Sequence, residues 1–105
     1  MNYNSTRNSG CVVTAAQEIA QGISQEGGLF VPETLPGLSR EDLEKMIGMS
    51  YNEKAKMVLS RFLTDFTSEE LDYCVDSAYN DRKFDSANIS EISRVGDSAY
   101  LLELW

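Results

Sequence analysis

Few side chains in this sequence could do chemistry. Histidine is absent from the 105 residues, which removes Ser-His-Asp and Cys-His nucleophile systems and the commonest zinc ligand. Neither Cys11 nor Cys74 has another cysteine nearby to complete a metal-ligand set, so both are expected to be reduced thiols. Any chemistry in the chain would therefore depend on lysine, tyrosine or carboxylate groups.

Two short motifs could bind an anion. Arg7 follows Ser5-Thr6 and could face the phosphate of a substrate or cofactor across a domain boundary. The favoured alternative is a surface arginine paired with a carboxylate, because exposed ion pairs are common without a function. Gly27-Gly28 lacks the wider glycine spacing and the Lys-Ser/Thr of a phosphate-binding loop. It is therefore interpreted as a tight turn into an extended segment.

An acidic cluster follows in the second half of the chain, and it consists of Asp65, Glu69, Glu70, Asp72 and Asp76. Most of these residues surround a predicted helix start, where negative charge is favourable to the helix dipole. The cluster lacks the glycine and glutamate spacing of a calcium loop. The sequence therefore predicts no metal site, and no catalytic or cofactor-binding residue is assigned to the chain.

The overall charge limits the possible partners. Seventeen acidic and nine basic residues give a net charge of −8, which disfavours nucleic acids and anionic membrane surfaces. The first residues lack the features of a secretory signal, and no apolar run approaches the roughly 20 residues that span a bilayer. We therefore expect a cytoplasmic protein with a single domain covering residues 1–105.

Four helix starts are marked by capping boxes, in which a hydroxyl residue is followed three positions later by an acidic or amide side chain. The pairs are Thr14 with Gln17, Ser39 with Asp42, Ser50 with Glu53, and Thr67 with Glu70. Gly22 and Gly48 are expected to end the first two helices in the left-handed conformation that favours glycine.

Apolar residues recur at helical spacing in the third and fourth predicted helices, which indicates faces that pack in a core. They are Tyr51, Ala55, Val58, Leu59, Phe62 and Leu63 in the third helix, and Leu71, Cys74, Val75, Ala78 and Tyr79 in the fourth. On this pattern Cys74 is a packing residue.

The remaining segments are predicted to be extended. Residues 2–7 could form an edge strand, and residues 29–31 form a short extended run. Gly96-Asp97 suits a two-residue turn between strands at 92–95 and 98–105. We therefore expect an α+β, helix-rich small domain with about four short helices and a small sheet formed by the N-terminal strand and the C-terminal hairpin.

The last predicted strand is apolar on both faces, which is typical of a strand inside a sheet. Tyr100, Leu102 and Leu104 would pack on the helices, while Ala99, Leu101 and Trp105 face the other way. We therefore expect this strand to lie between other strands, with Trp105 partly uncovered. Uncovered apolar surface beside a strand edge also predicts self-association of the chain.

Taken together, these segments resemble the N-terminal domain of the threonine synthase family. The resemblance rests on Ser5-Thr6-Arg7, Val13-Thr14 opening a helix that ends at Gln21-Gly22, the run Gly27-Gly28-Leu29-Phe30-Val31-Pro32 with Leu35-Pro36, and the final Leu102-Glu103-Leu104-Trp105. The glycine-rich run and the final Leu-Glu-Leu-aromatic strand are the specific parts.

The resemblance implies a function for a complete enzyme. Such an enzyme uses pyridoxal phosphate to convert O-phospho-L-homoserine and water to L-threonine and phosphate. The family's cofactor lysine would lie just beyond Trp105, so the resemblance implies a structural, non-catalytic domain that needs the remainder of the synthase chain as its partner. No cofactor is expected on this chain alone.

A second hypothesis comes from a different class of protein. The chain could be a free-standing acidic helical module that binds another protein through Trp105 and the apolar terminal strand. A reading frame that continues into a His-Gly-Pro-Thr segment and a Phe-Lys-Asp segment favours the enzyme.

The capping boxes give a testable prediction. Replacing Thr67 by alanine removes the side-chain acceptor of an otherwise unpaired N–H, so unfolding should become easier by about 0.5–2 kcal/mol. Thermal unfolding measures the change. An unchanged midpoint would mean that the helix begins elsewhere or that this end contributes little.

Overall fold

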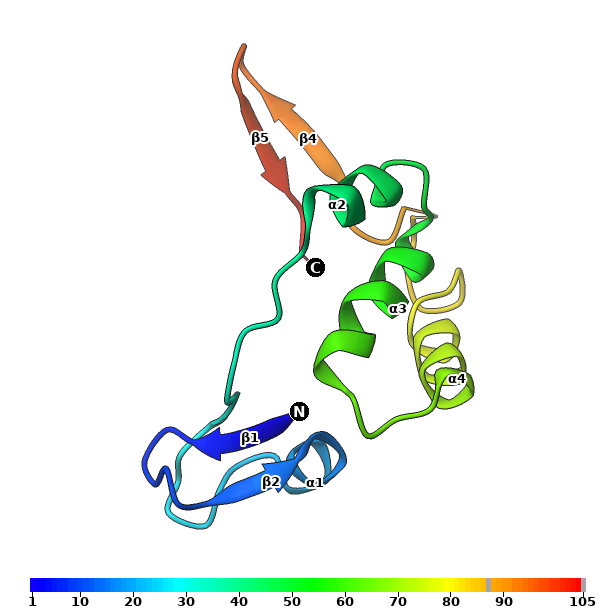
Figure 1. The fold of residues 1–105 in the computed structure, drawn as a ribbon. Coiled ribbons are helices and arrows are strands. Elements are labelled where there is room, and N and C mark those ends of the chain that lie inside the picture. Colours follow the sequence, from blue (N-terminus) through cyan, green and yellow to red (C-terminus); the bar gives the residue numbers. More distant parts are fainter. Residues whose placement is uncertain (87, 105) are drawn as a thin grey trace.

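In the part of the chain that the structure describes there are four helices and two small antiparallel sheets, so the α+β prediction is confirmed (Figure 1). The computed structural model describes residues 1–86 and 88–104. The helices are α1 (Ala15–Gln21), α2 (Arg40–Met46), α3 (Tyr51–Phe62) and α4 (Ser68–Ala78). The strands are β1 (Asn2–Ser5), β2 (Val12–Thr14), β3 (Phe30–Pro32), β4 (Ile92–Val95) and β5 (Ala99–Leu102).

All four predicted capping boxes are formed, each with both of its hydrogen bonds. Gly22 ends α1 as predicted, with a positive φ of 76°, but its ψ of −67° is not that of the left-handed helical conformation. The prediction for Gly48 is wrong. Helix α2 ends at Met46, and its C-cap is Ile47 in the right-handed conformation at a φ of −58°. The chain turns there without a left-handed residue.

The N-terminal strand lies at the centre of its sheet and not at the edge. The strand order is β2-β1-β3, with both neighbours antiparallel to β1. The prediction missed β2, because Val13 and Thr14 were interpreted only as the entry to a helix. Both edges of β1 are therefore occupied by strands that lie within the first third of the chain.

The core cluster sits where this sheet meets the helices. Tyr3, Ala15 and Phe30 are buried, and Leu63 and Phe66 pack against them while half-buried. The Tyr3 hydroxyl donates to the backbone carbonyl oxygen of Phe62 at 3.1 Å, which joins the central strand to the end of α3. Burial is the main cause that raises the pKa of the Tyr3 phenol.

Helices α3 and α4 pack against one another along their predicted apolar faces (Figure 1). Leu71 and Val75 of α4 are buried, whereas the apolar face of α3 is only half-buried. Cys74 is exposed, so its prediction as a packing residue is wrong. The reason is that the described residues place no further element over that side of α4.

The C-terminal hairpin forms a second sheet of its own, which corrects the prediction of one sheet shared with the N-terminal strand. The predicted two-residue turn is wrong: Val95 pairs with Ala99, so the turn has three residues, with Gly96 at a φ of 67°. The strand after it covers Ala99–Leu102 and not 98–105. In the part of the chain that the structure describes, β5 pairs only with β4 and does not lie between strands. The predictions for Trp105 lie outside the described residues.

An ion pair attaches α2 to α3. The Arg61 guanidinium lies 2.8 Å from the Asp42 carboxylate and also donates to the carbonyl oxygen of Gly37. Asp42 additionally accepts from the backbone N–H of Ser39 at 2.9 Å, as part of the capping box. The hydrogen bonds from Ser39, followed by that from Arg61, lower the pKa of the Asp42 carboxyl to about 2.

This carboxylate makes the attachment of α2 dependent on pH. The pKa of Asp42 in the folded chain is about 2, against an ordinary value of 3.8. The contribution of the ionised Asp42 carboxylate to stability is therefore complete at pH values above its ordinary pKa. It is lost as the pH falls through its pKa in the folded chain. NMR titration should give the Asp42 carboxyl a midpoint near pH 2, with the attachment of α2 weakening progressively as the pH falls below 3.8. Arg61→Gln should move the transition of the Asp42 resonances to higher pH, and an unmoved transition would contradict a role for the ion pair.

Candidate functional site

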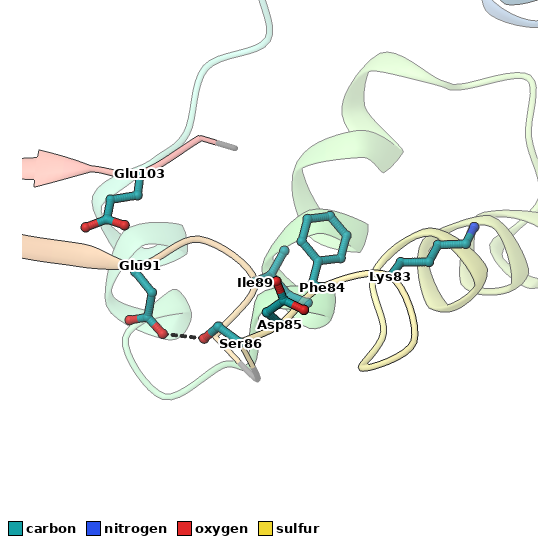
Figure 2. Close-up of a pocket in the computed structure, with 7 residues that line it drawn as sticks. All are labelled: Lys83, Phe84, Asp85, Ser86, Ile89, Glu91 and Glu103. Atoms are coloured by element: carbon teal, nitrogen blue, oxygen red, sulfur yellow. Dashed lines mark hydrogen bonds between the residues drawn. The ribbon is translucent and has the colours of Figure 1, made fainter.

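A cavity of about 400 Å³ lies where the loop after α4 meets the base of the hairpin (Figure 2). Its lining residues are Lys83, Phe84, Asp85, Ser86, Ile89, Glu91 and Glu103. Ile89 holds a φ of 64°, a left-handed conformation that is rare for a β-branched residue, so the loop is tightly turned here. The loop and the hairpin together position the polar groups of the cavity.

Carboxylates dominate the chemistry of this cavity. Glu91 accepts from the Ser86 hydroxyl and from the Asn88 amide at 3.3 Å, and Glu103 accepts from the Ser93 hydroxyl. Figure 2 shows the Lys83 side chain extending away from Asp85, Glu91 and Glu103. Three carboxylates around one cavity repel phosphate. The residues of this cavity therefore do not fit pyridoxal phosphate or a phosphorylated substrate.

Arg7, the other sequence candidate for anion binding, is exposed and engaged with the backbone. Its guanidinium donates to the carbonyl oxygen of Glu26 at 3.2 Å. The ion pair expected for Arg7 is not among those formed within residues 1–86 and 88–104. This hydrogen bond from Arg7 therefore stabilises the turn that follows Ser24.

Gly27-Gly28 forms the predicted tight turn. Gly27 has a φ of 80°, and Gly28 donates its N–H to the Ser24 hydroxyl at 3.0 Å. A Cβ on Gly28 would lie 2.1 Å from the Ser5 hydroxyl oxygen. The buried Ser5 and Ser24 hydroxyls hydrogen-bond to each other at 2.9 Å. Because Gly28 has no side chain, its backbone can lie directly against Ser5 of β1, and this close packing holds β1 next to the turn.

Residues of the acidic cluster cap a helix and form ion pairs between helices. Asp65 accepts from the Ala16 N–H at 3.0 Å, and this hydrogen bond is the main cause that lowers the pKa of Asp65. Lys56 of α3 is held by Asp72 at 3.2 Å and by Asp76 at 3.0 Å. Among the residues that the structure describes, no group of three or more side chains is placed to hold a metal ion.

The Asp65 contact could not be found in the sequence. It caps the N-terminus of α1 across 49 positions, in addition to the local capping box of Thr14. No spacing rule connects residues so far apart. The contact depends on the loop between α3 and α4 lying beside the start of α1.

An apolar groove of about 290 Å³ is a further hollow that the sequence did not indicate. Residues of α1, α3 and α4 line it together with neighbouring loop residues, and they are Ile19, Leu59, Leu63, Phe66, Leu71, Cys74, Val75, Ala78 and Tyr79. The groove explains why Cys74 is exposed although it lies on the apolar face of α4. None of the helices in residues 1–86 and 88–104 has the length and apolar character needed to cross a membrane.

The fold and these sites define a small mixed α+β domain whose charged groups mainly serve helix caps, turns and ion pairs. The family model described as "Threonine synthase N terminus" matches residues 2–79. The chain therefore belongs to the family of threonine synthase N-terminal domains.

Relatives and solved structures agree with this assignment. Threonine synthase from Methylobacillus glycogenes is 31% identical over 99% of this chain, and mouse "Threonine synthase-like 1" is 28% identical over 86% of it. A solved "PLP bound Threonine synthase" from Brucella melitensis matches 97% of the chain with a TM-score of 0.85 and 25% identity. The Escherichia coli threonine synthase shares the fold with a TM-score of 0.80 over 97% of this chain.

This chain is much shorter than the proteins that it matches. It covers 23% of the Methylobacillus protein and 12% of the mouse protein. It covers 22% of the Brucella chain and 22% of the Escherichia coli chain. The family likeness therefore concerns one domain of these larger proteins.

The glycine turn gives a testable prediction. Gly28→Ala should destabilise the chain by about 1–3 kcal/mol, because the new methyl group would displace Ser5 and break its hydrogen bond to Ser24. Gly37→Ala is the matched control, since a Cβ there meets no atom within 4 Å. Urea unfolding of both variants measures the difference, and equal stabilities would contradict this role of Gly28.

Proposed function

We propose that this chain is the amino-terminal domain of a threonine synthase that converts O-phospho-L-homoserine and water to L-threonine and phosphate. The family match over residues 2–79 carries this proposal. It is supported by the 31% identity to the Methylobacillus enzyme over nearly the whole chain. It is also supported by the shared fold of a threonine synthase with pyridoxal phosphate bound.

We further propose that this domain supplies no catalytic group. Pyridoxal phosphate provides an electron sink in such enzymes, and a lysine with a neutral amine must bond to it. Hydrogen bonding to Asp76, with a further contribution from Asp72, raises the pKa of Lys56. Its ammonium is held in ion pairs with these two carboxylates, so this lysine serves the packing of α3 against α4. The anionic cavity at the base of the hairpin is equally unsuited to the cofactor phosphate.

The residues of this domain have a structural role in the proposal. Asp65 and Tyr3 connect the N-terminal sheet and α1 to the pair of long helices. The glycine turn fixes β1 within that unit. The domain then presents its hairpin at the opposite end of the molecule (Figure 1). A free-standing interaction module is the alternative, and the similarity to enzymes along the whole chain favours the synthase domain.

A chimera tests the proposed function. The region of the Methylobacillus synthase that aligns with this chain is replaced by residues 1–105, and conversion of O-phospho-L-homoserine to threonine is measured. We expect activity, because the domain should fit the rest of a threonine synthase. The same synthase without that region is the control. A folded but inactive chimera would contradict the proposal.

A second test concerns the isolated chain. After the chain is mixed with pyridoxal phosphate and dialysed, borohydride should trap no cofactor on a lysine, because no lysine of residues 1–105 matches the cofactor motif of the family. Absorbance and mass spectrometry measure the adduct. A stable adduct at one lysine that Lys56→Arg abolishes would refute the non-catalytic role.

A further inference from the structure

The C-terminal hairpin exposes large apolar residues on both of its strands. Figure 1 shows β4 and β5 projecting from the body of the molecule beyond α2. Tyr100 is 69% exposed and Leu101 is 50% exposed, although both belong to a regular strand. Apolar residues in such a position are normally covered.

The pairing register shows that both faces of the hairpin are apolar. Partners across an antiparallel pair lie on the same face. One face therefore carries Ile92, Tyr100 and Leu102 beside the charged Arg94. The other carries Val95, Ala99 and Leu101 beside Ser93. The five large apolar side chains on the two faces are at least half exposed. A strand pair that is apolar on both faces suits a sheet that is covered on both sides.

The edges of the hairpin are also available. In the described residues β4 pairs only with β5, which leaves backbone donors and acceptors on the outer edges of both strands. Further strands could pair there while other elements cover the two faces. A flat surface contact with one helix would leave the second face and the edges uncovered. The hairpin therefore fits a partner that can extend its sheet.

We propose that the β4–β5 hairpin is the surface through which this domain docks onto the remainder of a threonine synthase chain, as part of a larger sheet. The inference rests on the proposed function and names the element that performs it. Its support is that solved threonine synthases contain this fold, hairpin included, as about 22% of a chain. The remaining polypeptide of those proteins is of the size needed to cover both faces.

Thiol labelling in the chimera tests the inference. The background carries Cys11→Ala and Cys74→Ser, and single probes are introduced as Leu101→Cys on one face and Tyr100→Cys on the other. Both probes should react at least about tenfold more slowly in the chimera than in the dilute, monomeric 105-residue chain, because a covered thiol reacts only after local opening.

Ile19→Cys is the matched control. Ile19 is 57% exposed and lies on α1 in the apolar groove. Figure 1 shows α1 at the end of the molecule away from the hairpin. Its labelling rate should be the same in the chimera and in the isolated chain. If Ile19→Cys becomes protected while the hairpin probes do not, the groove is the docking surface and the inference is wrong.

The remaining outcomes separate the two proposals. Hairpin probes that label in an active chimera as fast as in the isolated chain overturn the docking surface and leave the proposed function standing. A folded, inactive chimera overturns the proposed function and the docking surface with it. Protection that appears only at concentrations where the chains dimerise would assign the hairpin to a second copy.

A second chimera is made if the first does not fold. It uses the Corynebacterium glutamicum synthase, which is 30% identical over 96% of this chain, and the same labelling rates then test the docking surface.

Discussion

The hydrogen bond from Tyr3 to the end of α3 is the contact on which the arrangement of this domain depends. It joins the central strand of the N-terminal sheet to a helix 59 positions later, at the edge of the main core cluster. A phenol in this position contributes its ring to the core and its hydroxyl to a backbone acceptor. Asp65 strengthens the same junction by capping α1 from the loop that follows α3. The sheet, α1 and the helix pair therefore form one unit.

The polar groups of the domain are largely committed to holding that unit together. The buried hydroxyls of Ser5 and Ser24 bind each other and the glycine turn, which satisfies groups that would otherwise be costly to bury. Arg61 fastens α2, and Lys56 bridges α3 to α4. Resemblance to an enzyme family does not make every charged residue catalytic. Here the contacts of these side chains favour a structural role.

The apolar side chains of the domain are less completely buried than its polar groups are hydrogen-bonded. The helices α3 and α4 bury only part of their facing surfaces, and the hairpin stands with both faces open. The described residues leave the large apolar side chains of the hairpin at least half exposed. The relatives that this chain matches are more than four times as long, so they contain additional polypeptide that is available to cover such exposed apolar surface. Under the proposed function, the remainder of the synthase chain covers these surfaces.

The sequence by itself determined the features that depend on near neighbours. The four capping boxes and the turn at Gly27 involve residues within four positions of each other, so spacing was enough to predict them. The tertiary structure decided which strands share a sheet, that Cys74 is exposed, and that Asp65 caps α1. Those features depend on segments competing for the same backbone edges and apolar surfaces. Such competition involves the whole fold, and no local pattern records its outcome.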